Sequence, residues 1–259
     1  RAIRYYSKYR FFFNEEMADI TLTADNQVFI FTRGEIDTKG GRNIHSEDFY
    51  ISINLTDCTW SSSLYVGPPI NTKQNEGALT LSPDGQFVFY IGCNRDDGKG
   101  SCDIYIAKRS GDLWMQPINL GTVNSSKYET SPSFSSDGKS LYYSKGYNSS
   151  KGKDIWMSAF DGKRWSKPEK VEGINTDGEE IAPFIHPDGQ TLYFSSDGHP
   201  GMGGLDMFYS RKGADGKWQK PVNMGYPINT KGEEMGLFVN SDGDLAFISS
   251  AREGGYGSL

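Results

Sequence analysis

The chain has 259 residues, carries a formal net charge of −6 at pH 7, and contains 31 glycines and 14% aromatic residues. Because an acidic chain offers no basic face, nucleic acid and anionic membranes are not expected as partners. No apolar run reaches the roughly 20 residues of a membrane-spanning helix, so direct membrane insertion is not expected either.

The N-terminal stretch from Ala2 to Phe13 has the alternating pattern of two strands and precedes the first repeat. The chain opens without an initiator methionine, and it ends at Leu259 inside a repeat. Both ends are therefore expected to be cuts through a longer protein, and the lack of a signal peptide carries little meaning.

One unit recurs about every fifty residues, a period that is typical of solenoids, propellers and arrays. A clear copy begins at Glu129 with E-T-S-P-S-F-S-S-D-G-K-S-L-Y-Y-S. Two features mark the copies: turn aspartates at Asp25, Asp84, Asp137, Asp188 and Asp242, and tryptophans at Trp60, Trp114, Trp165 and Trp218. The tryptophans are expected to pack between repeats.

Each repeat is predicted to form four antiparallel strands. An Asp-Gly pair joins the first two, and this pair is the strongest short-range hairpin signal because glycine accepts a positive φ. The third strand contains D-I-W or D-M-F, and the fourth contains W-x-x-P, where proline suits an edge strand. Four antiparallel strands repeated radially make the blades of a β-propeller. The apolar period of two excludes a helical repeat.

The predicted fold class is therefore an all-β propeller in a single domain over residues 1–259. Counting turns gives five blades, and six is the alternative if missing C-terminal sequence adds one. Outer strands from residues 1–17 are expected to complete the last blade, closing the ring and removing exposed sheet edges. The blades are assigned to residues 18–70, 71–123, 124–174, 175–228 and 229–259, the last supplying inner strands only.

The three cysteines leave their pairing open. Cys93 and Cys102 stand at the two ends of one connection between strands, where a hairpin can bring them within bridging distance. Either these two cysteines form a disulfide or both are free thiols, and the sequence favours neither alternative. If they form a disulfide, Cys58 remains unpaired. No Cys/His pattern indicates zinc.

The connections between repeats share the signature N-x-x-x-x-E. Because the first strand of a blade is its innermost, these residues are expected at one mouth of the central channel, where they form a candidate site for a cation or a basic peptide. The alternative is structural: the side chains bond backbone groups and join neighbouring blades. Repetition in every blade favours the structural alternative. The residues are Asn71, Glu76, Asn124, Glu129, Asn175, Glu180, Asn229 and Glu234.

No catalytic residue, metal site or cofactor is predicted. The turn aspartates are expected to form turns, and Asp103, Asp154 and Asp206 to cap loops rather than to bind Ca²⁺, since no dense oxygen-ligand loop surrounds them. The three histidines fall at unrelated positions of the repeat, and no nucleophile motif is present.

The repeat resembles the TolB-type, WD-like β-propeller repeat, whose core S-P-D-G-x-x-L-x-F-x-S is matched from Ser82, Ser135 and His186. A fuller string, W-x-x-P-x-N-x-G-x-x-I-N-T-x-x-x-E from Trp218 to Glu234, is similar to the propeller of OmpA-family envelope proteins of Bacteroidetes, including PorE-like components of the type IX secretion system. This resemblance implies a periplasmic, outer-membrane-associated scaffold, with peptidoglycan bound only through a domain absent from this chain.

The expected function is a non-enzymatic, protein-binding module whose partners are other envelope or secretion-complex proteins. Its contact surfaces are expected at the channel mouth and at the loops Gly34–Ser46 and Gly146–Lys153. The alternative from another class is a glycan-binding or glycan-cleaving propeller. A spacer that only positions its neighbours is the third possibility.

Overall fold

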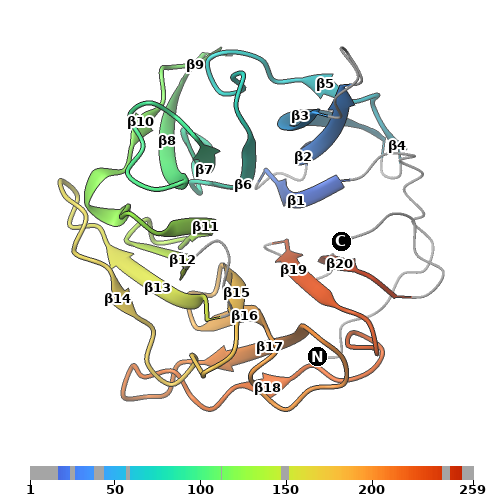
Figure 1. Ribbon diagram of the computed structural model, residues 1–259, viewed down its shortest axis with the longest axis vertical. Helices are drawn as coiled ribbons and strands as arrows, with labels where there is room; N and C mark the ends of the chain where they lie inside the picture. Colours follow the sequence, from blue (N-terminus) through green and yellow to red (C-terminus); the bar gives the residue numbers. More distant parts are fainter. Residues whose placement is uncertain are drawn as a thin grey trace.

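The structure is a computed structural model, and it describes residues 17–23, 27–37, 44–56, 59–111, 113–146, 152–240 and 246–252. The described strands form five antiparallel sheets arranged around one axis (Figure 1). Within these residues no helix has the length and apolarity that crossing a membrane requires.

Four of the sheets are complete blades of four or five strands. Blade 1 contains β1 (Met17–Leu22), β2 (Val28–Asp37), β3 (Ile44–Thr56), β4 (Thr59–Trp60) and β5 (Leu64–Tyr65). Blade 2 contains β6 (Glu76–Leu81), β7 (Phe87–Cys93), β8 (Cys102–Ser110), β9 (Leu113–Trp114) and β10 (Ile118–Asn119). Blade 3 contains β11 (Tyr128–Phe134), β12 (Ser140–Gly146), β13 (Asp154–Ala159) and β14 (Glu169–Lys170), and a short 3-10 helix (Gly121–Val123) precedes it. Blade 4 contains β15 (Glu180–Ile185), β16 (Thr191–Ser196), β17 (Asp206–Arg211) and β18 (Val222–Asn223).

The fifth sheet holds two strands in the described part of the chain, β19 (Glu234–Val239) and β20 (Ala246–Ser250). The predicted count of five blades, with six as the alternative, is therefore not matched: four blades are complete. The outer strands expected for the fifth sheet come from residues 1–17. Of these residues only Met17 lies within the described part, and it belongs to β1.

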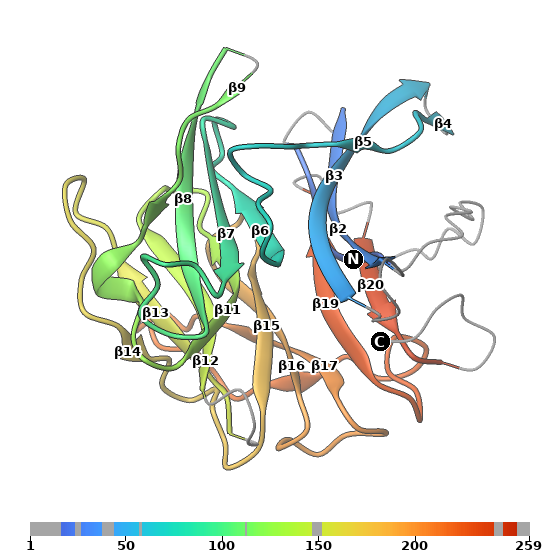
Figure 2. The same ribbon diagram turned by 45° about the horizontal axis from the view of Figure 1, so that its top comes forward.

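The first strand of each sheet lies nearest the axis (Figure 1). These innermost strands, β1, β6, β11, β15 and β19, contact one another in turn, and β19 also contacts β1. The fifth sheet also contacts β2, since the rings of Phe29 and Phe247 lie 5.4 Å apart between centroids, and Figure 2 shows this sheet next to blade 1. The contacts between first strands thus run all the way around the axis.

The hydrophobic core lies mostly between neighbouring blades. The ring of Trp165 in blade 3 meets Phe89 of blade 2 edge-on at a centroid distance of 5.9 Å. Trp218 in blade 4 meets Tyr142 of blade 3 at 6.1 Å. Trp114 packs into the cluster between blades 1 and 2, and Trp60 into the cluster between blade 1 and the fifth sheet. Burial of such aromatic surface is the main force that holds blades together.

The hairpin between the first two strands of a blade is closed by its aspartate. In blade 3, Asp137 accepts hydrogen bonds from the Ser135 hydroxyl at 2.6 Å and from the Lys139 amide at 3.0 Å. Gly138 follows with a φ of +70°, a conformation that glycine adopts without steric cost. Asp84 closes its hairpin in the same way, and Asp188 accepts the Gln190 amide and the Thr191 hydroxyl, both at 2.8 Å. Asp25 and Asp242 lie outside the described residues.

Every innermost strand contains a β-bulge. In four of them the bulged residue is the second after the connection glutamate, and it has a positive φ: Ala78, Ser131, Ala182 and Gly236. A bulge bends its strand and increases its twist. The bulges therefore help the strands to curve around the central axis.

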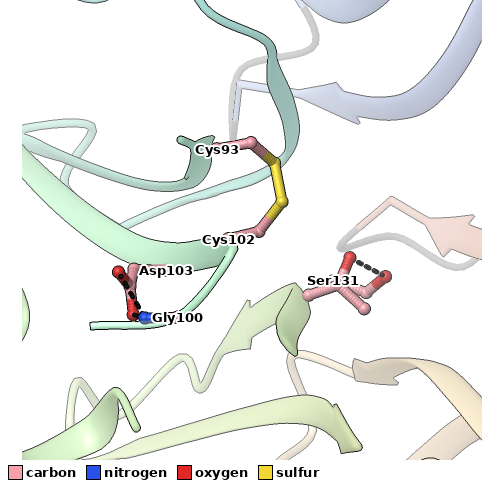
Figure 3. Close-up of a disulfide and its surroundings, with 6 residues drawn as sticks. Cys93, Gly100, Cys102, Asp103 and Ser131 are labelled. Atoms are coloured by element: carbon pink, nitrogen blue, oxygen red, sulfur yellow. Dashed lines mark hydrogen bonds between the residues drawn. A yellow bond between two sulfur atoms is a disulfide. The ribbon is translucent and has the colours of Figure 1, made fainter. Parts of the chain in front are cut away.

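A disulfide joins Cys93 to Cys102, which face each other across β7 and β8 with a Cα–Cα distance of 4.0 Å (Figure 3). The structure thus decides between the two alternatives left open by the sequence in favour of the bridge. Cys58 lies outside the described residues.

Candidate functional site

An asparagine begins each of four connections between blades. Asn229 is fully buried, and its side-chain oxygen accepts the Met207 amide at 2.8 Å while its side-chain nitrogen donates to the Met207 carbonyl at 3.0 Å. The amide side chain thus pairs with the third strand as a further backbone segment would. The same two bonds join Asn71 to Phe49, Asn124 to Ile104 and Asn175 to Ile155.

The glutamate five residues later closes the connection. Glu234 is fully buried, and it accepts the Thr230 amide at 2.9 Å and the Thr230 hydroxyl at 2.6 Å. Because Thr230 directly follows Asn229, one short loop is fixed from both ends. Glu76, Glu129 and Glu180 are equally buried and bond Thr72, Ser125 and Thr176 in the same way.

A third partner reaches these glutamates from the end of the second strand or from the loop that follows it. Arg95 lies 2.9 Å from Glu76, Lys145 lies 3.3 Å from Glu129, and Arg252 lies 3.6 Å from Glu234. Glu180 accepts the hydroxyl of Ser196 at 2.8 Å. These basic residues were not predicted from the sequence, although Arg95 and Arg252 share a signal, since each stands two residues after its second strand.

Burial affects the acidity of one of these groups. The pKa of Glu129 is raised above its ordinary value because burial penalises the charged carboxylate. Hydrogen bonds from Ser125 and the charge of Lys145 act in the opposite direction without cancelling the effect. A buried carboxylate with these partners is placed to hold the loop together.

The asparagines and glutamates are thus distributed one pair per connection, and each pair bonds mainly to its own loop and its own neighbouring strand. All of them are buried except Asn175, which is partly exposed. The exposed side chains on this face lie between the asparagine and the glutamate of each pair. They include Lys73, Gln74, Asp177, Lys231 and Glu233. Any partner that approaches this face meets these residues first.

The aspartates at the start of the third strands interact with nearby backbone amides or a lysine side chain. Asp103 accepts the amides of Lys99 and Gly100, and Asp206 accepts those of Met202 and Gly203 (Figure 3 for Asp103). Asp154 instead lies 2.7 Å from Lys170. In the part of the chain that the structure describes, no group of three or more His, Cys, Asp or Glu side chains is placed to hold a metal ion.

The histidines also serve local contacts. His186 accepts the Asp188 amide at 3.1 Å through Nδ1, within a hairpin. His199 lies 2.7 Å through Nε2 from the Ile174 carbonyl, which makes this nitrogen the donor. The side chain of His45 lies outside what the structure describes, as does most of the loop Gly146–Lys153. The loop predicted at Gly34–Ser46 is shorter than expected, because Gly34–Asp37 belong to β2 and Ile44–Ser46 belong to β3, and residues 38–43 lie outside the described part.

A cavity of about 790 Å³ runs along the axis of the ring. Its walls come from the five innermost strands, including the bulged residues, and its volume lies within the range of small-molecule sites. Among the described residues that line it, the acids are Glu47 and Asp84 and the base is Arg109. A central channel was expected from the propeller fold, but the residues that line it were not predicted from the sequence because they do not share a motif.

Glu47 and Asp84 lie at opposite ends of the cavity. Glu47 of β3 pairs with Gly34 of β2, and the preceding residue Arg33 pairs with Met17, the first residue of β1. Glu47 therefore lies one position beyond the start of β1. Asp84 follows the other end of an innermost strand, in the hairpin after Leu81. A six-residue strand spans about 20 Å at roughly 3.3 Å per residue. The two carboxylates are therefore too far apart to act on one bond.

Solved structures share this architecture. A putative TolB from Agrobacterium tumefaciens superposes with a TM-score of 0.51 at 15% sequence identity, covering 92% of this chain and 91% of its own. In fold, the chain is a TolB-like β-propeller. At this level of identity the likeness shows the fold alone.

Enzymes share the propeller fold as well. A gluconolactonase from Xanthomonas campestris matches the propeller with a TM-score of 0.53 at 14% identity, over 90% of this chain and 69% of its own. An α-L-arabinofuranosidase from Lactobacillus brevis matches it with a TM-score of 0.52 at 14% identity, over 80% and 76%. No protein-family model and no curated protein sequence matches the propeller. The fold is thus shared by a TolB-type protein and by hydrolases, and function must be argued from the site.

Proposed function

We propose that this propeller is a non-enzymatic module that binds other proteins and serves as a scaffold. The observation that carries the proposal is the placement of the carboxylates. The four connection glutamates are fully buried and hydrogen-bonded. Among the lining residues that the structure describes, the two acids lie at opposite ends of the cavity.

A glycan-cleaving propeller would need a different arrangement. Hydrolysis of a glycosidic bond uses two carboxyl groups about 5–9.5 Å apart on either side of the bond. Glu47 and Asp84 do not meet this requirement, and the described lining residues offer no other acid. This supports binding over hydrolysis.

Rigidity supports the scaffold part of the proposal. Each connection is fixed by a hydrogen-bonded asparagine at one end and a buried glutamate at the other, so the exposed residues between them are held in place. A surface that is already ordered loses little conformational entropy when it binds a partner. We propose the exposed residues of these connections, with the neighbouring loops Gly34–Ser46 and Gly146–Lys153, as the partner-binding face.

The proposed location is the periplasm, in association with the outer membrane, and the proposed partners are other proteins of an envelope complex such as a type IX secretion system. The disulfide between Cys93 and Cys102 supports an oxidising compartment, because such bonds persist outside the reducing cytosol. The string from Trp218 to Glu234, which resembles PorE-like propellers, supports the choice of complex.

The test is a pull-down from envelope extract with the intact protein and with the same protein lacking this propeller. The proposal predicts that specific secretion-complex proteins are recovered only when the propeller is present. If every partner is still recovered without it, the propeller does not bind them and the proposal fails.

A further inference from the structure

The central cavity has two chemically different sides. The fourth residue after each connection glutamate occupies the same register in its strand, and the matching position of β1 is Thr21. In blades 1, 2 and 3 this position holds Thr21, Thr80 and Ser133, whereas the next two sheets place Phe184 and Phe238 there. All five residues line the cavity. The repeat thus loses its symmetry at the point where the five strands face one another.

The aromatic side is continuous. The rings of Phe184 and Phe238 lie 5.4 Å apart between centroids with an interplanar angle of 54°, and Phe247 lies 6.4 Å from Phe238. Phe247 also lines the cavity. Together these rings offer an apolar surface against which the flat face of a ligand can pack.

The opposite side offers hydroxyl groups that can still donate. Ser133 Oγ accepts the Ile185 amide at 3.0 Å, and Thr80 Oγ1 accepts the Phe134 amide at 3.4 Å. A hydroxyl that accepts one hydrogen bond keeps its own hydrogen for another acceptor. These two groups can therefore donate to a ligand without giving up their structural bonds.

Thr32 adds an unsatisfied group to this side. It lines the cavity and is 3% exposed, and its hydroxyl has no hydrogen-bond partner among the described residues. A buried polar group without a partner costs about 1–3 kcal/mol. Rotation about a single side-chain bond can turn this hydroxyl toward the cavity, where a ligand oxygen would satisfy it.

We propose that the central cavity binds a neutral saccharide of two or three sugar units. A sugar ring has an apolar face of C–H groups and an edge of hydroxyls, which matches the two facing sides of this cavity. Arg109 lies at the same end of the cavity as Asp84, since its backbone amide donates to the Gln86 carbonyl. The walls between the two ends carry no charged side chain among the described residues, so an acidic or basic ligand would lose its hydration there without gaining a partner. This binding activity goes beyond the proposed scaffold function.

The experiment is a glycan array of neutral and acidic oligosaccharides probed with the purified propeller, followed by calorimetric titration of the best neutral glycan. Two variants test the two sides. Thr32→Val keeps the shape and removes the hydroxyl, and Phe238→Leu keeps an apolar residue and removes the ring. Thr59→Val, on an exposed threonine of β4, is the matched control.

We expect a neutral glycan to bind and each cavity variant to weaken binding at least about fivefold, as expected for a lost hydrogen bond or ring contact, while the control binds unchanged. If Phe238→Leu does not fold, the binding affinity of Thr32→Val alone tests the proposal. The proposal is overturned if no neutral glycan binds, if acidic glycans or peptides are preferred, or if both folded variants bind as before. The bound glycan is then recovered and its length is checked. If the glycan has been cleaved, the proposed non-enzymatic function fails, whereas the proposal that the cavity binds a saccharide still stands.

Discussion

Arg95 places its guanidinium nitrogen Nη2 2.9 Å from the fully buried Glu76 carboxylate and 3.0 Å from the carbonyl of Ile70. One arginine therefore ties the loop after β7 to the connection between blades 1 and 2. Arg252 does the same for the fifth sheet, bonding the carbonyls of Pro227 and Ile228. Charge pairs of this kind hold the loops on which the proposed binding face stands.

Removing the arginine from this pair leaves a buried negative charge. We expect Arg95→Met to lower the free energy of unfolding by about 3 kcal/mol, the usual order for breaking a buried pair. Arg95→Met combined with Glu76→Gln removes both charges and should recover part of the loss. Urea denaturation of the three proteins measures this, and a double variant less stable than Arg95→Met would contradict the account.

The raised pKa of Glu129 predicts a pH dependence. The folded protein holds the Glu129 proton more tightly than the unfolded chain does, because burial disfavours the charge. Its contribution to stability is therefore fully present below the ordinary value of 4.5 and is lost as the pH rises through the folded pKa.

The variant Glu129→Gln stays neutral at every pH. The stability of Glu129→Gln relative to the unsubstituted chain should therefore increase as the pH rises from 4.5 toward neutrality, in urea denaturation at a series of pH values. Glu169→Gln, on an exposed residue of β14, is the control and should show a smaller trend. A constant or falling difference for Glu129→Gln would show that burial does not dominate.

The connection asparagines should differ in importance according to their burial. Asn229→Ala leaves the amide and carbonyl of Met207 without partners in a buried place, which costs about 2–4 kcal/mol. Asn175 makes equivalent bonds to Ile155 but is partly exposed, so water can replace them and Asn175→Ala should cost less. Chemical denaturation ranks the two variants, and the reverse order would be evidence against this explanation.

The disulfide should stabilise the fold by restricting the unfolded chain. For a loop as short as that between Cys93 and Cys102, chain entropy gives about 2–3 kcal/mol. Replacing both cysteines by serine should lower the unfolding free energy by this amount. A reducing agent should destabilise the unsubstituted chain and leave the double variant unaffected. Equal stability under oxidising and reducing conditions would show that the bridge contributes nothing.

Local sequence signals predicted much of this architecture. The Asp-Gly pairs identified hairpins such as that at Asp137, because turn geometry depends on two adjacent residues. Proline after Trp165 and Trp218 correctly indicated the outermost strands, since β14 and β18 begin directly after the prolines that follow these residues. Features that a few neighbouring residues determine are thus visible in the sequence.

Features that depend on distant residues were not predicted. The partner of Glu76 is Arg95, nineteen residues away in the next loop of its blade. The two sides of the cavity appear only when Thr80 and Phe184 are placed in the same register of two different blades.

The central claim is that exposed residues of the connections bind protein partners while the buried pairs beside them hold the blades. The most direct measurement is quantitative recovery of envelope proteins by the intact protein carrying Lys73→Glu and Lys231→Glu, both at exposed positions of the connections. We expect the amount of each specific partner that is recovered to fall severalfold while the melting temperature stays unchanged. Reversing surface charges lowers the rate at which the partner associates without disturbing the fold. Unchanged recovery of every partner by this double variant would contradict the claim.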